Sequence, residues 1–287
     1  MPTPDGLMSG PSAEQPPAAP HGLWHRIVAL TDRLWATPTR IIEQIGVHVL
    51  LLVQSVRWLF KRPFRWGVLF DAMDYIGVQS LLIVAMIGLF VGMVFALQLT
   101  SALRQFGTEG FVGATLGLAV TRELSPVFTA IVVAARAGAG MATELGSMRI
   151  TEQIDALATL AVNPVQYLVT PRVVAGTIMV PLLSMLFVAM AMLGGYGVAV
   201  YLENVDPGVF VENARWLVDS RDLLQGVVKA TVFGCALTII SCTQGFNASG
   251  GAKGVGIGTT RAVVGSFVTI LVLDYFLTDI ILLLQHK

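Results

Sequence analysis

Residues 75–99 read YIGVQSLLIVAMIGLFVGMVFALQL, a run of 25 residues without Asp, Glu, Lys, Arg or His. A helix needs about 20 predominantly apolar residues to cross a bilayer. Further apolar stretches follow at residues 111–140, 173–201, 223–242 and 263–284. The chain is 55% hydrophobic and only 13% charged, with a mean hydropathy of +0.74, whereas soluble proteins carry about 25% charged residues. The sequence therefore predicts an all-α, polytopic membrane protein with five transmembrane helices.

The region before the first span divides into two parts. Residues 1–22 are rich in Pro, Gly and Ala without apolar periodicity, so we predict a disordered tail rather than a signal peptide. In residues 23–66 apolar side chains recur at helical spacing, but charged and amide residues interrupt them before any run is long enough to span. We therefore predict an interfacial amphipathic helical segment at 23–66, with Trp58 and Arg65 at headgroup level, followed by a five-span domain at 67–287.

The distribution of Lys and Arg predicts the orientation of the spans. Cytoplasmic loops carry an excess of these residues. With the N-terminus in the cytoplasm, four basic residues lie outside: Arg104, Arg215, Arg221 and Lys287. Eleven then lie inside: Arg26, Arg33, Arg40, Arg57, Lys61, Arg62, Arg65, Arg149, Arg172, Lys253 and Arg261. The sequence therefore predicts a cytoplasmic N-terminus.

Several classes of function have no support in the sequence. The formal net charge is zero and basic blocks are missing, which argues against nucleic-acid binding. Cys235 and Cys242 lie seven residues apart on one predicted helix, or about 10 Å, too far for a disulfide. The four histidines are scattered outside the spans, so we expect no metal site, and we discern no nucleophile–base arrangement.

A charged pair interrupts the second span. Arg122 and Glu123 stand shortly before Pro126 in an otherwise apolar stretch. A charge at the centre of a span costs about 2.5–3.5 kcal/mol and therefore rarely faces lipid, while proline kinks a helix. Two interpretations stay open: a polar elbow that faces a cavity or partner helix, and a structural ion pair that only stabilises packing. Adjacent residues point about 100° apart on a helix, so the two charges need not pair with each other.

Small residues occur at four-residue spacing in several spans, which lets helix backbones approach closely in lipid. Examples are Gly88–Gly92, Gly113–Gly117 and Ala134–Gly138, and three more glycines lie close together at 194, 195 and 197. We expect most of them to pack within the chain and at least one to serve a dimer contact. The glycine-rich stretch 250–260 does not fit the P-loop pattern, so we predict a flexible turn between spans four and five.

A polar segment separates the second and third spans. Residues 143–157 read TELGSMRITEQIDAL, in which Ile150 and Ile154 lie on one helical face and Glu152 and Asp155 lie on the other. The Asn-Pro pair at 163–164 disfavours further helix. We predict a short amphipathic helix, at about 144–160, along the cytoplasmic surface. From the residues alone, an ordinary loop helix is an equal alternative.

These motifs, in this order, resemble the MlaE family of ABC-transporter permeases, the membrane subunits of bacterial Mla and Mce lipid-transport systems. The resemblance covers about residues 40–284. The matching stretches are GMVFALQ at 92–98, RELSPV at 122–127, ARAG at 135–138, the 143–157 segment, NP at 163–164, PR at 171–172, TTR at 259–261 and LDYFLT at 273–278. One departure is Ser125, where the family commonly has Gly. Since Ser is also small, we expect the elbow to be preserved.

The resemblance implies a homodimer of five-span chains in the bacterial inner membrane, with a phospholipid cavity at the dimer interface that opens toward the periplasm. The implied lipid contacts are Leu89, Gly92, Met93, Ala96, Leu97, Thr100, Arg122 and Glu123. The 144–160 segment resembles the family's coupling helix, which docks on the ATPase through residues here at Glu144, Met148, Arg149, Glu152, Gln153 and Asp155. The implied partners are a cytoplasmic ABC ATPase dimer (MlaF-type) that holds ATP and Mg²⁺, a periplasmic MCE-domain ring (MlaD-type) and a small STAS-domain subunit (MlaB-type).

Two functions from other classes compete with this interpretation. An ion-coupled secondary transporter would use Glu123, Asp274 and Asp279 as carriers and need no ATPase, but the inverted repeats that would favour it are not visible. An intramembrane enzyme would need a nucleophile with its base, or a metal cluster, within the spans. We expect instead a non-enzymatic permease subunit that binds no cofactor, with ATP hydrolysis in a partner.

Overall fold

The computed structural model describes residues 45–59 and 65–285. In these ranges the chain is helical apart from short connections and contains no β-strand, which confirms the all-α prediction. The predicted tail at 1–22 and the first part of the predicted interfacial segment lie outside the described residues. The described part of that segment forms a helix, Ile45–Leu59. From Val47 onward the chain belongs to one compact unit, which holds all the elements discussed below.

Five helical segments are long and apolar enough to cross a membrane: Trp66–Arg104, Glu109–Ile150, Val165–Tyr201, Ser220–Phe246 and Gly251–Leu284. They confirm the five predicted spans, and the chain is a polytopic membrane protein. Each segment is longer than the apolar stretch that predicted it. Apolarity marks the part of a helix inside the bilayer, whereas the helical hydrogen bonding continues into the polar flanks.

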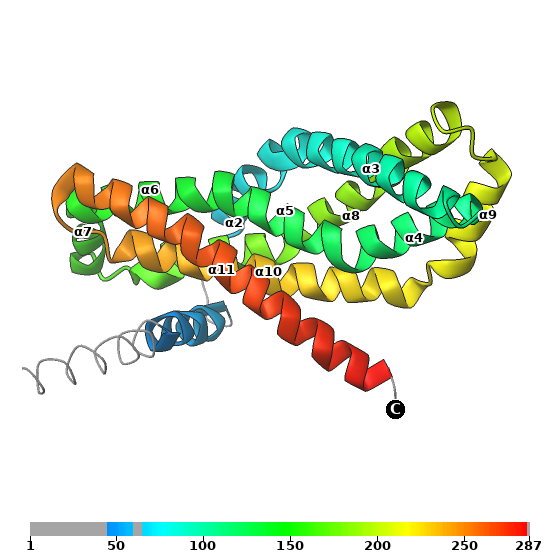
Figure 1. The fold of residues 1–287 in the computed structure, drawn as a ribbon. Coiled ribbons are helices and arrows are strands. Elements are labelled where there is room, and N and C mark those ends of the chain that lie inside the picture. The colour runs from blue at the N-terminus through cyan, green and yellow to red at the C-terminus, as the bar shows by residue number, and fades with distance from the viewer. Residues whose placement is uncertain (1–44, 60–64, 286–287) are drawn as a thin grey trace, which may run out of the picture. The chain divides into compact units, whose positions relative to one another are not determined.

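Figure 1 shows how the helices run. In chain order they are α2 (Trp66–Ile76), η1 (Val78–Ser80), α3 (Leu81–Arg104), η2 (Glu109–Phe111), α4 (Val112–Ala119), η3 (Val120–Leu124), α5 (Ser125–Val133), η4 (Ala134–Gly138), α6 (Ala139–Ile150), α7 (Gln153–Thr159), η5 (Val165–Val169), α8 (Thr170–Tyr201), α9 (Pro207–Leu217), α10 (Ser220–Phe246) and α11 (Gly251–Gln285). Helix α10 packs against α8 and α11, and α3 packs along α8.

Glycines allow α3 and α8 to come into backbone contact. A methyl group added at Gly92 would lie 2.0 Å from the carbonyl oxygen of Ala191, and one added at Gly194 would lie 2.3 Å from that of Leu89. Both distances are far below van der Waals contact. The prediction that these small residues pack within the chain is therefore confirmed for this pair of helices, while a dimer contact stays a prediction. Of the glycines at 194, 195 and 197 in α8, only Gly197 could take a methyl group without a contact within 4 Å.

The predicted elbow in the second span takes the form of a widened helical turn. Residues Val120–Leu124 are π-helical, and Pro126 follows in the first turn of α5. A proline has no backbone N–H for the preceding turn, and a π-turn accommodates the interrupted hydrogen-bond ladder. Single π-turns inside α-helices are frequent at functional sites, and this one carries both Arg122 and Glu123.

The predicted single helix at 144–160 is wrong. Its first half belongs to α6, which continues the second span to Ile150, and its second half is the separate helix α7. Glu152 between them has a left-handed φ of 61°, which an α-helix cannot contain. Packing of α6 against α10 and α11 extends the span beyond the point where its apolar pattern ends.

The predicted flexible turn at 250–260 is also wrong, because α11 begins at Gly251. The chain reverses at Gly250 and Gly251, whose φ angles of 85° and 69° favour glycine. Val255 is buried and faces Gly146 of α6. This tertiary contact holds the first turns of α11 in a helix in spite of the low helix propensity of glycine.

Candidate functional site

A buried lysine connects three of the spans. Lys229 of α10 has a side chain that is 0% exposed, and its Nζ lies 2.5 Å from Glu123 Oε2 in η3. Nζ also lies 3.0 Å from Asp274 Oδ1 in α11 and donates a 2.8 Å hydrogen bond to Thr278 Oγ1. The Asp274 contact is an ion pair without hydrogen-bond geometry, since Oδ1 accepts no hydrogen bond from the described residues. Ionised side chains within a membrane are tolerated when they pair in this way.

Local features of the sequence bring these groups together. Gly226 lies one helical turn before Lys229, and a methyl group there would lie 2.3 Å from the carbonyl oxygen of Thr121. The missing side chain allows α10 to approach η3, so that Lys229 reaches the carboxylate of Glu123. On α11, Asp274 and Thr278 are four residues apart and therefore share one helical face.

A second ion pair lies beside the first. Arg122 contacts Asp222 Oδ1 through Nε at 2.8 Å and through Nη2 at 2.6 Å. The other oxygen of Asp222 accepts from the backbone N–H of Asp219 in the capping box that begins α10. Asp222 thus stabilises the helix N-terminus and holds Arg122 at the same time.

We refer to Arg122, Glu123, Asp222, Lys229 and Asp274 as the ion cluster. It combines two cations with three carboxylates, so its formal net charge is −1. Lys229 is fully enclosed, whereas the side chains of Arg122 and Glu123 are 31% and 40% exposed. In the described ranges no group of His, Cys, Asp and Glu could hold a metal ion. The cluster offers polar contacts to a ligand at its open side.

The structure decides between several alternatives for the charged residues. Arg122 and Glu123 take separate partners instead of each other. Asp274 joins the ion cluster, whereas Asp279 is exposed and takes no part in it. Lys229 was not among the predicted site residues, although a lone lysine in the apolar stretch 223–242 is a detectable signal. Asp222 lies just before the apolar stretch 223–242, and its distance of 100 residues from Arg122 gave no indication of the pair.

The predicted lipid contacts on α3 separate into two groups. Gly92, Ala96 and Thr100 are buried where α3 meets the rest of the chain, with Gly92 against Ala191 and Ala96 near Gly195 of α8. Their burial within the chain argues against these three as lipid contacts. Small residues at such positions allow close helix packing instead. Leu89 and Met93 are half-buried and Leu97 is 41% exposed, so these three stay candidates.

The predicted ATPase-coupling residues lie around the junction of α6 and α7. Glu144 pairs with Arg172 at the start of α8, with a distance of 2.8 Å. Arg149 and Asp155 bridge the junction at 2.6 Å. Of the predicted residues, Glu152 and Gln153 are exposed at the break, while Met148 is half-buried in an apolar cluster. The bridges stabilise a corner at the end of the second span, and ATPase contact by these residues stays a prediction.

Comparison with known proteins places the chain in a family. The Permease MlaE family matches residues 69–280, from α2 to α11. A probable ABC transporter permease protein of Rickettsia typhi is 37% identical over 242 residues, which cover 84% of this chain and 93% of that protein. The intermembrane phospholipid transport system permease protein MlaE of Haemophilus influenzae is 40% identical over 220 residues, or 75% of this chain and 83% of the relative. The chloroplastic protein TRIGALACTOSYLDIACYLGLYCEROL 1 of Arabidopsis thaliana is 35% identical over 245 residues, or 85% and 70%. The family match reaches all five membrane-spanning helices and contains three of them entirely, and the chain belongs to the MlaE family of ABC-transporter permeases.

Proposed function

We propose that this permease subunit moves phospholipids or related lipids between the bacterial inner membrane and a periplasmic MCE-protein carrier, driven by ATP hydrolysis in a partner ATPase. The main support is the position of the ion cluster next to exposed apolar surface on α11. The Haemophilus influenzae relative is named as the permease of an intermembrane phospholipid transport system. A phospholipid needs both kinds of surface, polar contacts for its headgroup and apolar contacts for its acyl chains.

Helix α11 combines these two kinds of surface. Of the 18 most apolar consecutive residues in this span only 6% are buried, whereas 56% of the corresponding residues in the α10 span are buried. Asp274 and Thr278 on α11 contact Lys229, while Leu271, Val272 and Phe276 beside them are exposed. Figure 1 shows the C-terminal half of α11 running away from α10. An exposed apolar face of this length needs lipid or a second protein surface to cover it, and we propose that a second copy of the chain encloses a lipid cavity there.

The helix of the second span provides a route for coupling to ATP hydrolysis. Residues Glu109–Ile150 form one helical segment, which carries Arg122 and Glu123 in its first half and the proposed coupling corner at its end. We place this corner and the N-terminus in the cytoplasm, where the Lys and Arg residues are more numerous. An ATPase dimer with bound ATP and Mg²⁺ would push on the corner, and the π-turns η3 and η4 are the places where the segment can change its geometry. A STAS-domain subunit would bind on the same side.

The ion-coupled alternative receives less support from the geometry. Two of its three proposed carriers, Glu123 and Asp274, already pair with the enclosed ammonium group of Lys229, which they share. A carboxylate that already has a fixed internal cation offers a transported cation little net attraction. The third proposed carrier, Asp279, does not join them.

Purification in mild detergent from a bacterial host, followed by mass spectrometry of proteins and lipids, tests the proposal. We expect an ATPase, an MCE protein and phospholipid to co-purify with the chain. Transport by the reconstituted chain alone, driven by an ion gradient, would contradict an ATP-driven mechanism.

The coupling corner can be tested separately. Glu152→Lys reverses an exposed charge at the break between α6 and α7, so we expect the ATPase to be lost from the purified complex. Glu212→Lys on α9 reverses another exposed acid in a different helix and serves as the control. If the Glu152 variant retains the ATPase and transports normally, the coupling assignment is wrong.

A further inference from the structure

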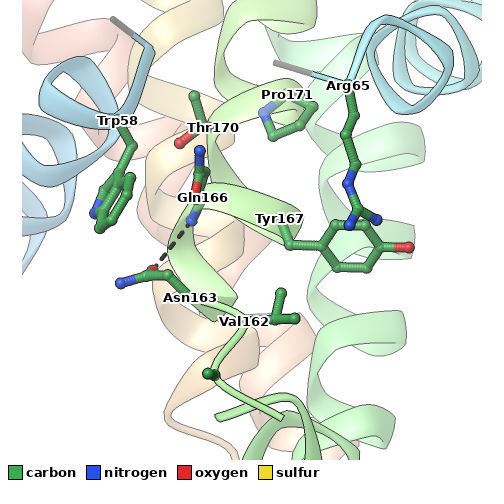
Figure 2. Close-up of a pocket in the computed structure, with 9 residues that line it drawn as sticks. Trp58, Arg65, Val162, Asn163, Gln166, Tyr167, Thr170 and Pro171 are labelled. Atoms are coloured by element: carbon green, nitrogen blue, oxygen red, sulfur yellow. Dashed lines mark hydrogen bonds between the residues drawn. The ribbon is translucent and has the colours of Figure 1, made fainter. Parts of the chain in front are cut away.

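A pocket of about 250 Å³ lies near the start of the third span. It is lined by Trp58, Arg65, Ala161, Val162, Asn163, Gln166, Tyr167, Thr170 and Pro171 (Figure 2). Trp58 comes from the helix Ile45–Leu59, and the residues from 161 to 171 follow α7 and continue into α8. No residue of the ion cluster lines this pocket, so it is a separate site.

The lining carries a positive charge without a counter-charge. Arg65 is the only charged residue among the described residues that line the pocket. Its guanidinium lies over the ring of Tyr167, with 4.9 Å from Cζ to the ring centroid, as Figure 2 shows. A guanidinium group carries five N–H donors, so the N–H groups that do not point at the ring can still donate to a ligand. Within the described ranges no carboxylate lies at ion-pair distance from Arg65.

Asn163 adds neutral donors to this site. Its Oδ1 accepts from the backbone N–H groups of Val165 and Gln166, at 3.0 and 3.2 Å, and thereby caps the start of η5. An amide side chain with its oxygen used in this way presents its NH₂ group, which has two donors. The hydroxyl of Tyr167 can also donate. A fixed cation with neutral donors around it is suited to the oxygens of a phosphate group.

The remaining lining residues favour a lipid headgroup over a free anion. Trp58, Val162 and Pro171 add apolar surface next to the donors, and tryptophan with arginine is typical of the headgroup zone of a membrane. The volume lies slightly below the range of about 300–1,000 Å³ for small-molecule sites, which is enough for a headgroup but too small for acyl chains.

We propose that this pocket binds the phosphate headgroup of an anionic phospholipid from the cytoplasmic leaflet. The bound lipid would connect the helix Ile45–Leu59 with the start of α8 and so hold the two elements at one level of the membrane. This site is independent of the proposed transport substrate, because it uses neither the ion cluster nor the exposed face of α11.

Native mass spectrometry of the full chain in mild detergent can count the lipids bound at this site. The probes are dioctanoyl phosphatidylglycerol, dioctanoyl phosphatidylcholine and inorganic phosphate. Two variants test the pocket in different ways: Arg65→Gln removes the charge, and Val162→Trp fills the space while the charge stays. Arg57→Gln is the matched control, since Arg57 is exposed next to Trp58 but does not line the pocket.

We expect the native chain and the Arg57 control to bind one phosphatidylglycerol more than either pocket variant. We expect the affinity of that site to fall about tenfold or more in Arg65→Gln, as on loss of a charge-assisted hydrogen bond. Equal lipid counts in the native chain and both pocket variants would overturn the proposal. Equally tight binding of inorganic phosphate would show a site for soluble anions instead, and equal binding of phosphatidylcholine would show that the charge of the lipid plays no part. Unchanged gel-filtration profiles and helical circular dichroism identify variants that are folded.

Discussion

Removal of the buried ammonium group of Lys229 tests whether the ion cluster stabilises the fold. The cluster has two cations and three carboxylates, so Lys229→Met changes its formal charge from −1 to −2. Glu123 and Asp274 both lose their cation, and Thr278 loses a donor. Their side chains are 40% and 22% exposed, so partial solvation reduces the penalty. We expect a loss of about 3 kcal/mol in the free energy of unfolding, the low end of the roughly 3–5 kcal/mol typical of a broken buried pair.

Thermal unfolding in detergent, followed by circular dichroism, measures this loss. On the scale of soluble domains of similar size, about 3 kcal/mol lowers the Tm by roughly 6–12 °C. Asp274→Asn in the Lys229→Met background restores the charge of −1, so it should recover part of the lost stability. Lys253→Met removes an exposed lysine at the start of α11 and is the control. If Lys229→Met unfolds at the same temperature as the native chain and this control, the ion cluster does not hold the three spans together.

Two further predictions concern helix packing. A methyl group at Gly92 would lie 2.0 Å from the carbonyl oxygen of Ala191, so Gly92→Ala should destabilise the chain by about 1–3 kcal/mol through overpacking. In the control Gly197→Ala the added methyl group meets open space, so the Tm should stay unchanged or rise. Equal Tm values for the two variants would contradict the α3–α8 contact. Ser125 donates a 2.7 Å hydrogen bond to the carbonyl oxygen of Ser184. Because Ser125→Ala leaves this buried acceptor without its donor, we expect it to lower the free energy of unfolding by about 1–3 kcal/mol in the same assay. An unchanged Tm would show that this bond adds no stability.

Much of the architecture could be predicted from the sequence because it depends on local properties. A run such as residues 75–99 is long enough for a bilayer and carries no charge, and these two facts are sufficient to predict a span. Arg122, Glu123 and Pro126 could be singled out for the same reason, since charges and proline are exceptional within a span. The motifs that resemble the MlaE family are also local, and the family match extends over the same spans.

Where local signals ended, the predictions failed. The sequence indicated one helix at 144–160, but Glu152 adopts a left-handed conformation. This conformation is uncommon for glutamate, so the residue type did not predict it. It indicated a loop at 250–260, but the contact between Val255 and Gly146 stabilises a helix rich in glycine. In both places packing between distant segments outweighs intrinsic propensity, which differs by only about 1 kcal/mol per residue.

The composition and order of the residues therefore determine that this protein crosses the membrane five times and that it carries charges at bilayer depth. Only the tertiary structure decides how those charges combine. Glu123 and Lys229 are 106 residues apart in the chain, and they meet because Gly226 lets α10 approach the π-turn η3. A charge in a low-dielectric interior must find an opposite charge nearby, and which partner it finds depends on how closely two helices can approach.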